Sequence, residues 1–432
     1  MERLAYKELK KWKESERRKP LIINGARQVG KTYLLREFGK NEYRQCAYIN
    51  CDSNRFVDDV FVDYDTKRII MSLSAALTID ITPGDTLIIL DEIQENPRAL
   101  NSLKYFCENA PEYHIAVAGS LLGISLHSGV SFPVGKVDMI KLFPLTFNEF
   151  LLATRQNGLY AALVSRQWDV VSSLQSKYID LLRQYYYVGG MPEVVQAYID
   201  GRGLTEVRNI QKQILFNYKR DFSKHTPERE TPRVNMVWDS IPSQLAKDNQ
   251  KFIYGALKKG ARANDFEIAI QWLIDAGLIY KVSRISTPTP PLKFYEDLTA
   301  FKLFMLDVGL MGAMANVDSA NILLGESIFS EYKGAFTELY VLTQLMGLDI
   351  PVYYYSTNDS KIEIDFLIEV AGHVVPIEVK AEENVKSKSL KTYIDKHPEL
   401  KGLRLSMKNR QDQEWMENLP LYAFVDEISG RM

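Results

Sequence analysis

An eight-residue segment that matches the phosphate-binding pattern GxxxxGK[ST] constrains the fold more than any other part of this sequence. The segment comprises Gly25, Ala26, Arg27, Gln28, Val29, Gly30, Lys31 and Thr32. An apolar run, Leu21–Ile23, precedes it, and the helical pattern YLLREF follows it. A glycine-rich turn between a buried strand and a helix directs backbone N–H groups at an anion. The sequence therefore predicts a P-loop in an α/β fold rather than a glycine-rich turn that matches by accident.

The residue types of this segment predict the ligand. Lys31 is expected to pair with the β and γ phosphates of ATP, and the hydroxyl of Thr32 is expected to contact Mg²⁺. The other six residues are expected to bind ATP through the loop backbone. ATP and Mg²⁺ are thus the expected cofactors.

A second motif lies at the end of the apolar run Leu87–Leu90, which leads directly into Asp91 and Glu92. At the end of a buried strand, Asp91 can hold Mg²⁺ through a water, and Glu92 can activate the attacking water. The alternative is a solvated strand end. Ser120 follows the next apolar run, where it either senses the γ-phosphate or caps a turn. We predict Lys31, Glu92 and Ser120 as the catalytic residues.

Short apolar runs alternate with helical patterns from Pro20 to about Phe150, which predicts a parallel sheet with helices on both faces. The predicted strands are Leu21–Ile23, Cys46–Ile49, Leu87–Leu90, Ile115–Ala118 and Val137–Leu142. The predicted helices begin at Lys31, in the Phe56–Leu77 region and at Pro97, where proline suits a first helical turn. Residues 1–144 are therefore expected to form a complete P-loop ATPase core.

Three further segments are expected after this core. Residues 145–225 read as a helical lid or connector. Residues 226–325 give helices and then a hairpin with Pro288, Pro290 and Pro291 near its turn, which predicts a winged helix-turn-helix. Residues 326–432 begin with a helix, continue as strands and contain a lysine-rich helix, which predicts a small α/β domain.

Composition sets limits on compartment and partners. Lys plus Arg total 53 against 55 Asp plus Glu, so no overall basic excess indicates nucleic acid. The three cysteines have no metal-ligand spacing, and no segment is apolar over the length of a bilayer span. We therefore expect a soluble, cytoplasmic protein without a membrane partner.

Read in order, the segments GARQVGKT, LDEIQ, AGS, LFPLTFNEF and GGMPEVV resemble a prokaryotic group of AAA-type ATPases. In that group a domain of unknown function follows the ATPase module and contains a winged helix and a restriction-endonuclease-like fold. The later segments LIDAGLIYKV, FKLFMLDVGLM, EIDFLI and PIEVK are similar to that second half. The sequence departs from the group at Ala26, where proline is expected, and at Lys136, where arginine is usual, so no arginine finger is assigned.

Asp365, Glu378 and Lys380 have the spacing of the PD-(D/E)XK nuclease core. Residues two apart in a strand share a face, so Glu378 and Lys380 are expected to point the same way, across from a strand that carries Asp365. The two acids could hold a divalent cation while Lys380 orients a water, with Glu338 on the preceding helix as a fourth member. The alternative is a nuclease-like fold retained as a binding scaffold.

Basic residues near this cluster favour either contacts with a phosphate backbone or ordinary solvated helix faces. They are Lys380, Lys386, Lys388, Lys391, Lys396, Lys401, Arg404, Lys408 and Arg410, together with Lys251, Lys258, Lys259 and Arg262 before the predicted wing.

The leading hypothesis is an ATP-driven switch that acts on nucleic acid. Its rival is a signalling or assembly ATPase whose C-terminal half binds protein. The expected partners beyond ATP are accordingly DNA, a protein or further copies of the chain. A small-molecule kinase is a third alternative, which Glu92 and the long C-terminal half disfavour.

Overall fold

The computed structural model describes residues 1–52, 55–120, 132–247, 250–324, 330–357, 361–381 and 387–432. Within these residues the chain divides into two compact units. The first unit contains Met1–Phe143 and Asp275–Leu278, and the second contains Pro144–Ile274 and Ile279–Met432.

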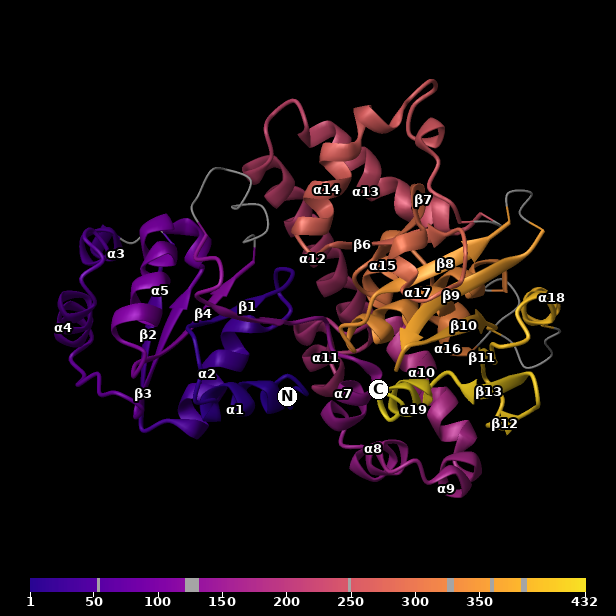
Figure 1. Cartoon of the computed structure of the whole chain (residues 1–432), viewed down its shortest axis with the longest axis horizontal. Helices are drawn as coiled ribbons and strands as arrows, with labels where there is room; N and C mark the ends of the chain where they lie inside the picture. Colours follow the sequence, from indigo (N-terminus) through magenta and orange to yellow (C-terminus); the bar gives the residue numbers. More distant parts are fainter. Residues whose placement is uncertain (53–54, 121–131, 248–249, 325–329, 358–360, 382–386) are drawn as a thin grey trace. The chain divides into compact units, whose positions relative to one another are not determined.

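The first unit is built on a five-stranded, all-parallel sheet with the strand order β2-β3-β4-β1-β5 (Figure 1). Its strands are β1 (Leu21–Asn24), β2 (Gln45–Asn50), β3 (Thr86–Asp91), β4 (His114–Gly119) and β5 (Asp138–Lys141). Its helices are α1 (Tyr6–Glu14), α2 (Lys31–Glu42), α3 (Arg55–Val60), α4 (Thr66–Leu77), η1 (Ile93–Glu95) and α5 (Pro97–Asn109). The five predicted strands and the helices that begin at Lys31 and Pro97 are confirmed.

The region Phe56–Leu77 forms two helices rather than one. Tyr64 adopts a positive φ of 59°, and Asp65 caps α4 by accepting hydrogen bonds from the backbone N–H groups of Lys67 and Arg68. A side chain that caps a helix N-terminus favours a new helix start over continuation of the preceding helix. The apolar periodicity alone did not reveal this break.

Alternating side chains of the strands pack against helices on both faces of the sheet. Ile88 and Leu90 belong to a core with residues of α3, α4 and α5. On the opposite face, α2 packs against β2, β3 and β4. The carboxyl ends of the parallel strands therefore lie together at one edge, where ligands bind in folds of this kind.

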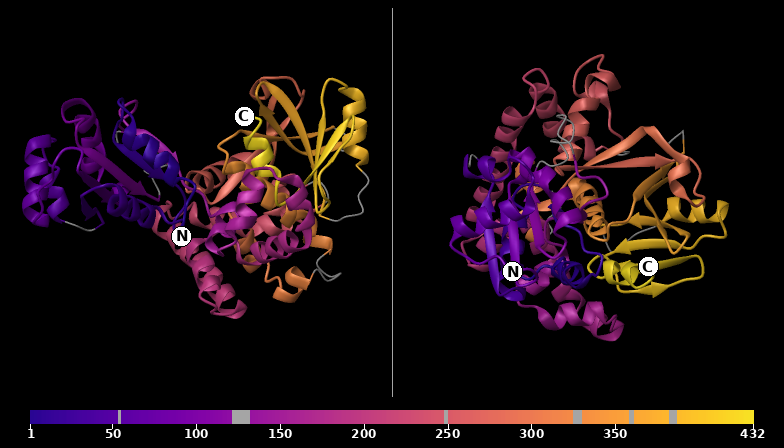
Figure 2. Two further views of the ribbon diagram at one scale, coloured as in Figure 1. Left: turned by 90° about the horizontal axis from the view of Figure 1, so that it is seen from below. Right: turned by 60° about the vertical axis from the view of Figure 1, so that its left-hand side comes forward.

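The second unit contains an eight-stranded mixed sheet with the order β12-β13-β11-β10-β9-β8-β6-β7. Orange and yellow strands of this sheet are seen from two further sides in Figure 2. Its strands are β6 (Ile279–Ile285), β7 (Glu296–Met305), β8 (Val352–Ser356), β9 (Glu363–Val370), β10 (His373–Val379), β11 (Gly402–Ser406), β12 (Gln411–Asp412) and β13 (Met416–Pro420). The hairpin of β6 and β7 pairs with β8 in parallel, so the predicted wing and the C-terminal strands share one sheet.

Helices make up the rest of the second unit. They are α7 (Phe147–Ala153), α8 (Asn157–Val164), α9 (Trp168–Ser173), α10 (Gln175–Val188), α11 (Pro192–Ile199), α12 (Leu204–His225), α13 (Thr231–Leu245), η2 (Tyr254–Ala256), η3 (Ala263–Asp265), α14 (Glu267–Asp275), η4 (Leu292–Tyr295), α15 (Val308–Met314), α16 (Ser319–Leu324), α17 (Ser330–Met346), α18 (Lys388–Lys396) and α19 (Phe424–Ser429). The predicted helical segment 145–225 thus contains α7 to α12. The predicted segments after residue 144 lie in this one unit, apart from Asp275–Leu278.

A buried aromatic cluster fixes α17 within this unit. The ring of Tyr340 on α17 packs edge-on against Phe147 of α7 and Tyr185 of α10. The side chain of Gln344, also on α17, accepts a hydrogen bond of 2.7 Å from the backbone N–H of Phe147. These contacts position the helix that carries Glu338.

Candidate active site

The P-loop runs from the end of β1 to the start of α2, as the sequence predicts. Gly30 caps α2 with a φ of 93°, a backbone conformation that favours glycine. A Cβ on Gly25 would lie 2.2 Å from the backbone oxygen of Leu142, so the loop can approach this neighbouring segment only with glycine there. Ala26 and Val29 are buried.

Lys31 lies inside the loop that it is predicted to serve. Its side chain is 8% exposed, and Nζ donates hydrogen bonds of 2.9 Å to the Gly25 oxygen and 2.7 Å to the Ala26 oxygen. Burial lowers the pKa of Lys31 to about 8, although the carboxylates of Glu92 and Asp91 oppose that shift. A partly desolvated ammonium group gains more from anionic phosphate oxygens than a solvated one does.

Thr32 and Asp91, the two predicted Mg²⁺ ligands, are in contact. The Thr32 hydroxyl donates a hydrogen bond of 3.1 Å to Asp91 Oδ1, and the backbone N–H of Glu92 donates to the same oxygen at 3.1 Å. Hydroxyl and carboxylate oxygens are the ligands that Mg²⁺ prefers. Thr32 and Asp91 would hold a Mg²⁺ ion, which would neutralise phosphate charge when bound.

Tyr48 is a residue of this site that the sequence analysis missed. Its hydroxyl donates a hydrogen bond of 2.8 Å to Asp91 Oδ2, and the guanidinium of Arg36 lies 4.7 Å from the centre of its ring. Burial, and then the hydrogen bond to Asp91, raise the pKa of Tyr48 to about 12, so the phenol stays a donor. No local sequence signal identifies Tyr48, because only the pairing of β2 with β3 brings it to Asp91.

Glu92 and Ser120 also meet, at the ends of β3 and β4. The Ser120 hydroxyl donates to Glu92 Oε2 at 3.4 Å, and the Gln94 amide donates to the same oxygen at 2.6 Å. Glu92 has a φ of 51°, which is uncommon for a residue with a side chain. The structure therefore brings the predicted base and the predicted sensor together and adds Gln94.

Arg3 is a further residue that no motif indicated. Its side chain is 6% exposed and donates hydrogen bonds of 2.8 Å to the Val29 oxygen and 2.6 Å to the Phe143 oxygen. Val29 belongs to the P-loop, and Phe143 ends the first unit. Arg3 thus links the backbone of the P-loop at Val29 to the backbone at Phe143.

Lys136, which stands where the resembling group has arginine, forms an ion pair of 2.9 Å with Glu108. This pair raises the pKa of Lys136 and lowers that of Glu108. The contact is a partly exposed one, of the kind that contributes little to stability.

A parallel sheet, a P-loop before its first helix and carboxylates at the end of β3 define a P-loop nucleotide-binding domain. Residues 17–151 match the family described as an AAA domain. The first unit is therefore an AAA-type P-loop domain, which agrees with the resemblance stated from the sequence.

The second unit matches families whose role is not defined. Residues 179–321 match a domain of unknown function, DUF8612, and residues 333–424 match another, DUF4143. Among solved structures, the chain is similar to the Aeropyrum pernix Orc1 protein in complex with DNA, with 13% sequence identity and a TM-score of 0.29. That match covers 73% of this chain and 93% of the other. A comparison with curated proteins found no match.

The C-terminal residues singled out by the sequence lie in the second unit. The register of β9 and β10 pairs Ile377 with Phe366, so Glu378 stands opposite Asp365 on the same face of the sheet. Asp365 Oδ2 accepts a hydrogen bond of 2.7 Å from the Val379 N–H, and Lys380 Nζ lies 3.1 Å from Glu378 Oε1. Glu378 is 3% exposed.

Glu338 on α17 faces a lysine that the sequence analysis missed. Lys302 on β7 is 1% exposed, and its Nζ lies 2.6 Å from Glu363 Oε1 and 3.8 Å from Glu338 Oε2. The Gln250 amide donates to the other Glu338 oxygen at 2.8 Å. Burial and the charge of Asp365 raise the pKa of Glu338 to about 8, while Lys302 opposes that shift. Burial disfavours the ammonium of Lys302, yet the surrounding carboxylates outweigh it and raise the Lys302 pKa.

The described part of the chain contains no group of three or more His, Cys, Asp or Glu side chains placed to hold a metal ion. Metal binding by Asp365 and Glu378 therefore stays a prediction. The same described residues include no helix long and apolar enough to cross a membrane.

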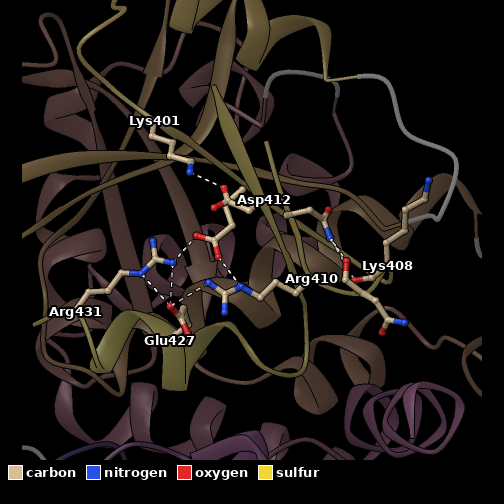
Figure 3. A network of polar contacts seen from close by, with 9 residues as sticks. Lys401, Lys408, Arg410, Asp412, Glu427 and Arg431 are labelled. Atoms are coloured by element: carbon tan, nitrogen blue, oxygen red, sulfur yellow. Dashed lines mark hydrogen bonds and ion pairs between the residues drawn. The ribbon is translucent and has the colours of Figure 1, made fainter. Parts of the chain in front are cut away.

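Several residues of the predicted basic surface are engaged within the second unit (Figure 3). Lys401 pairs with Asp412 at 2.5 Å, and Arg410 and Arg431 both contact Glu427. Arg410 also donates to Glu417 at 2.9 Å. These ion pairs attach α19 to the β12–β13 edge. Lys386 lies outside the described residues.

Proposed function

We propose that this protein binds ATP with Mg²⁺ and hydrolyses it to ADP and phosphate in its first unit. One observation carries the proposal: residues from three separate motifs converge at the strand ends, with Thr32 on Asp91 and Ser120 on Glu92. In this assignment Lys31 pairs with the β and γ phosphates. Thr32 and Asp91 hold Mg²⁺, which neutralises phosphate charge when it is bound.

Glu92 is proposed as the general base. Its carboxylate takes a proton from the attacking water, and Gln94 holds that carboxylate at the strand end. Ser120, which donates to the same carboxylate, is proposed to contact the transferred γ-phosphoryl group. Tyr48 keeps Asp91 oriented through its hydroxyl.

Two substitutions in the full-length chain test this assignment. Lys31→Ala is expected to remove most ATP binding, because the loop then loses its ammonium group, and calorimetry measures the affinity. Glu92→Gln is expected to keep ATP bound and to slow phosphate release roughly a hundredfold or more. Lys67→Ala, an exposed lysine on α4, is the control and should change neither quantity. Unchanged affinity in Lys31→Ala would refute the P-loop assignment, and wild-type turnover in Glu92→Gln would place the base elsewhere.

For the chain as a whole we propose a nucleotide-driven switch acting on nucleic acid, in which ATP occupancy changes the conformation of the second unit. The helices before the β6–β7 hairpin support a winged-helix role, and the basic residues support contact with phosphates. The rival proposal is an assembly ATPase whose second unit binds protein. Stimulation of ATP turnover by DNA would favour the first, and a stable protein partner without such stimulation would favour the second.

Two proposals also stand for the C-terminal part of the second unit, which we propose to be restriction-endonuclease-like. The first is a metal-dependent nuclease site with Asp365 and Glu378 as ligands and Glu338 and Lys380 adjacent. It is supported by the buried Glu378 Oε2, which has no hydrogen-bond partner among the described residues. The second is a binding scaffold without nuclease activity. Cleavage of DNA with Mg²⁺ or Mn²⁺ that Asp365→Asn abolishes would select the first.

A further inference from the structure

The buried lysine at the acidic cluster bears on which of these two proposals holds. Four carboxylates lie in this region, those of Glu338, Glu363, Asp365 and Glu378. Lys302 comes from β7, far in sequence from the PD-(D/E)XK-like segment, and it reaches Glu363 and Glu338 at 2.6 Å and 3.8 Å. A lysine that is 1% exposed has given up its hydration, so it must gain a compensating interaction with carboxylates.

Of the remaining carboxylates, Glu378 has protein cations beside it, and Asp365 has a backbone donor. Glu378 contacts Lys380 at 3.1 Å, and the sheet register places Arg404 of β11 directly opposite Glu378. Asp365 accepts the Val379 backbone N–H. Four carboxylates therefore stand with three protein cations before any metal is considered.

Glu338 is partly engaged within the protein. One of its oxygens accepts the Gln250 amide at 2.8 Å, and the other, which has no hydrogen-bond partner among the described residues, lies 3.8 Å from Lys302 Nζ. A divalent cation at the cluster would have to compete with an ammonium group that is already in place, and the repulsion between two buried cations is strong where the dielectric is low.

We propose that Lys302 neutralises this acidic cluster in place of a divalent cation, so that the second unit folds without a bound metal ion. The inference concerns the proposed nuclease-like site and is independent of ATP hydrolysis. The second unit then acts as a metal-independent scaffold.

Mn²⁺ titration by calorimetry tests the proposal on the full-length chain without nucleotide. Every variant carries Lys31→Ala, so that ATPase activity cannot contribute. The parent chain, which carries Lys31→Ala alone, should show no Mn²⁺ binding that depends on Asp365. Lys302→Met deletes the ammonium group and keeps much of the side-chain volume, so it should gain Mn²⁺ affinity at least about tenfold, and Asp365→Asn should abolish the gain. Lys281→Met, an exposed lysine on the paired strand β6, is the matched control and should gain none.

Thermal unfolding gives a second readout that a general packing defect would not reproduce. Lys302→Met should lower the Tm by about 5–10 °C, because it leaves buried carboxylates without their cation. Adding Glu363→Gln should recover part of that loss, and Mn²⁺ should raise the Tm of Lys302→Met more than that of the parent.

The parent chain keeps the proposal falsifiable if Lys302→Met does not fold. An Mn²⁺ site in the parent that Asp365→Asn removes would overturn the proposal and establish metal binding. An equal response of Lys302→Met and Lys281→Met would also overturn it. Recovery of folding in the Lys302→Met, Glu363→Gln double variant would support it.

Discussion

Replacing Asp307 with asparagine tests how the second unit holds its GGMPEVV segment. Asp307 follows β7 and caps α15, and its side chain is 2% exposed. Oδ2 accepts a hydrogen bond of 2.6 Å from the Gly190 N–H, and Oδ1 accepts one of 2.8 Å from the Leu310 N–H. A Cβ at Gly189 would lie 2.3 Å from Oδ1, so glycine is needed there for the carboxylate to approach.

Burial of the Asp307 carboxylate raises its pKa from 3.8 to about 6, although backbone N–H donors, Gly190 first, oppose the shift. The folded carboxyl group keeps its proton up to a higher pH than the unfolded one does. The stability that this provides is fully present below pH 4 and is lost as the pH rises through 6. At about 1.4 kcal/mol per pKa unit, the loss is about 3 kcal/mol.

An asparagine side chain does not titrate, but its amide nitrogen cannot accept a hydrogen bond, so Asp307→Asn leaves either the Gly190 or the Leu310 N–H group without its acceptor. The variant should therefore be less stable than the wild type near pH 4 by about 1–3 kcal/mol, and this deficit should shrink by up to about 3 kcal/mol as the pH rises above 7. Urea unfolding followed by tryptophan fluorescence measures the difference. Of the five tryptophans, Trp12 lies in the first unit, and the second contains Trp168, Trp238, Trp272 and Trp415.

Asp65→Asn is the matched control, because Asp65 also caps a helix through two backbone N–H groups but is exposed. It should not stabilise the protein at neutral pH. A difference between Asp307→Asn and wild type that stays constant from pH 4 to 7.5 would refute the reasoning. So would a deficit of the variant that grows as the pH rises, since the backbone donors would then favour the carboxylate more than burial penalises it.

Substitutions at three other sites have expected outcomes, and two of them have a control substitution. Tyr48→Phe removes a donor to Asp91, so the Mg²⁺ concentration for half-maximal phosphate release should rise about tenfold. Equal Mg²⁺ dependence would remove Tyr48 from the site. Gly190→Ala puts a Cβ 2.2 Å from the Leu145 oxygen and should lower the Tm by several degrees. Gly158→Ala in α8 meets no atom within 4 Å and should instead stabilise by about 0.5–1 kcal/mol. Arg3→Met leaves the Val29 and Phe143 oxygens without this donor, so calorimetry should find ATP affinity reduced about tenfold, whereas the exposed Arg44→Met should not change it.

The sequence predicted the first unit well because β1, β2, β3 and β4 each contain an uninterrupted apolar run. β3 is longer than the predicted run Leu87–Leu90 by one residue at each end. Thr86 and Asp91 still pair with β2, although both residues are polar. The P-loop and the pair Asp91 and Glu92 could be predicted for a similar reason. Each directly follows an apolar run, and the carboxyl ends of parallel strands lie at the ligand-binding edge of the sheet.

The residues that the sequence did not reveal are those whose role depends on a partner distant in sequence. Arg3 acts through carbonyl groups 26 and 140 residues away, and Tyr48 through Asp91, 43 residues away. Neither residue belongs to a motif, and an arginine or tyrosine near an apolar run is compatible with many environments. Only the strand order, which places β2 beside β3, brings Tyr48 to Asp91.

The second unit was harder to predict because its sheet joins segments that the sequence separates. The hairpin of β6 and β7 was expected to belong to a wing apart from the C-terminal strands, yet β6 pairs with β8 and extends the same sheet. This pairing is what brings Lys302 to Glu338 and Glu363. The spacing of Asp365, Glu378 and Lys380 suggested a metal because two acids on neighbouring strands could hold one divalent cation. In our proposal Lys302, which the long-range sheet brings to Glu338 and Glu363, supplies positive charge at this cluster from within the chain.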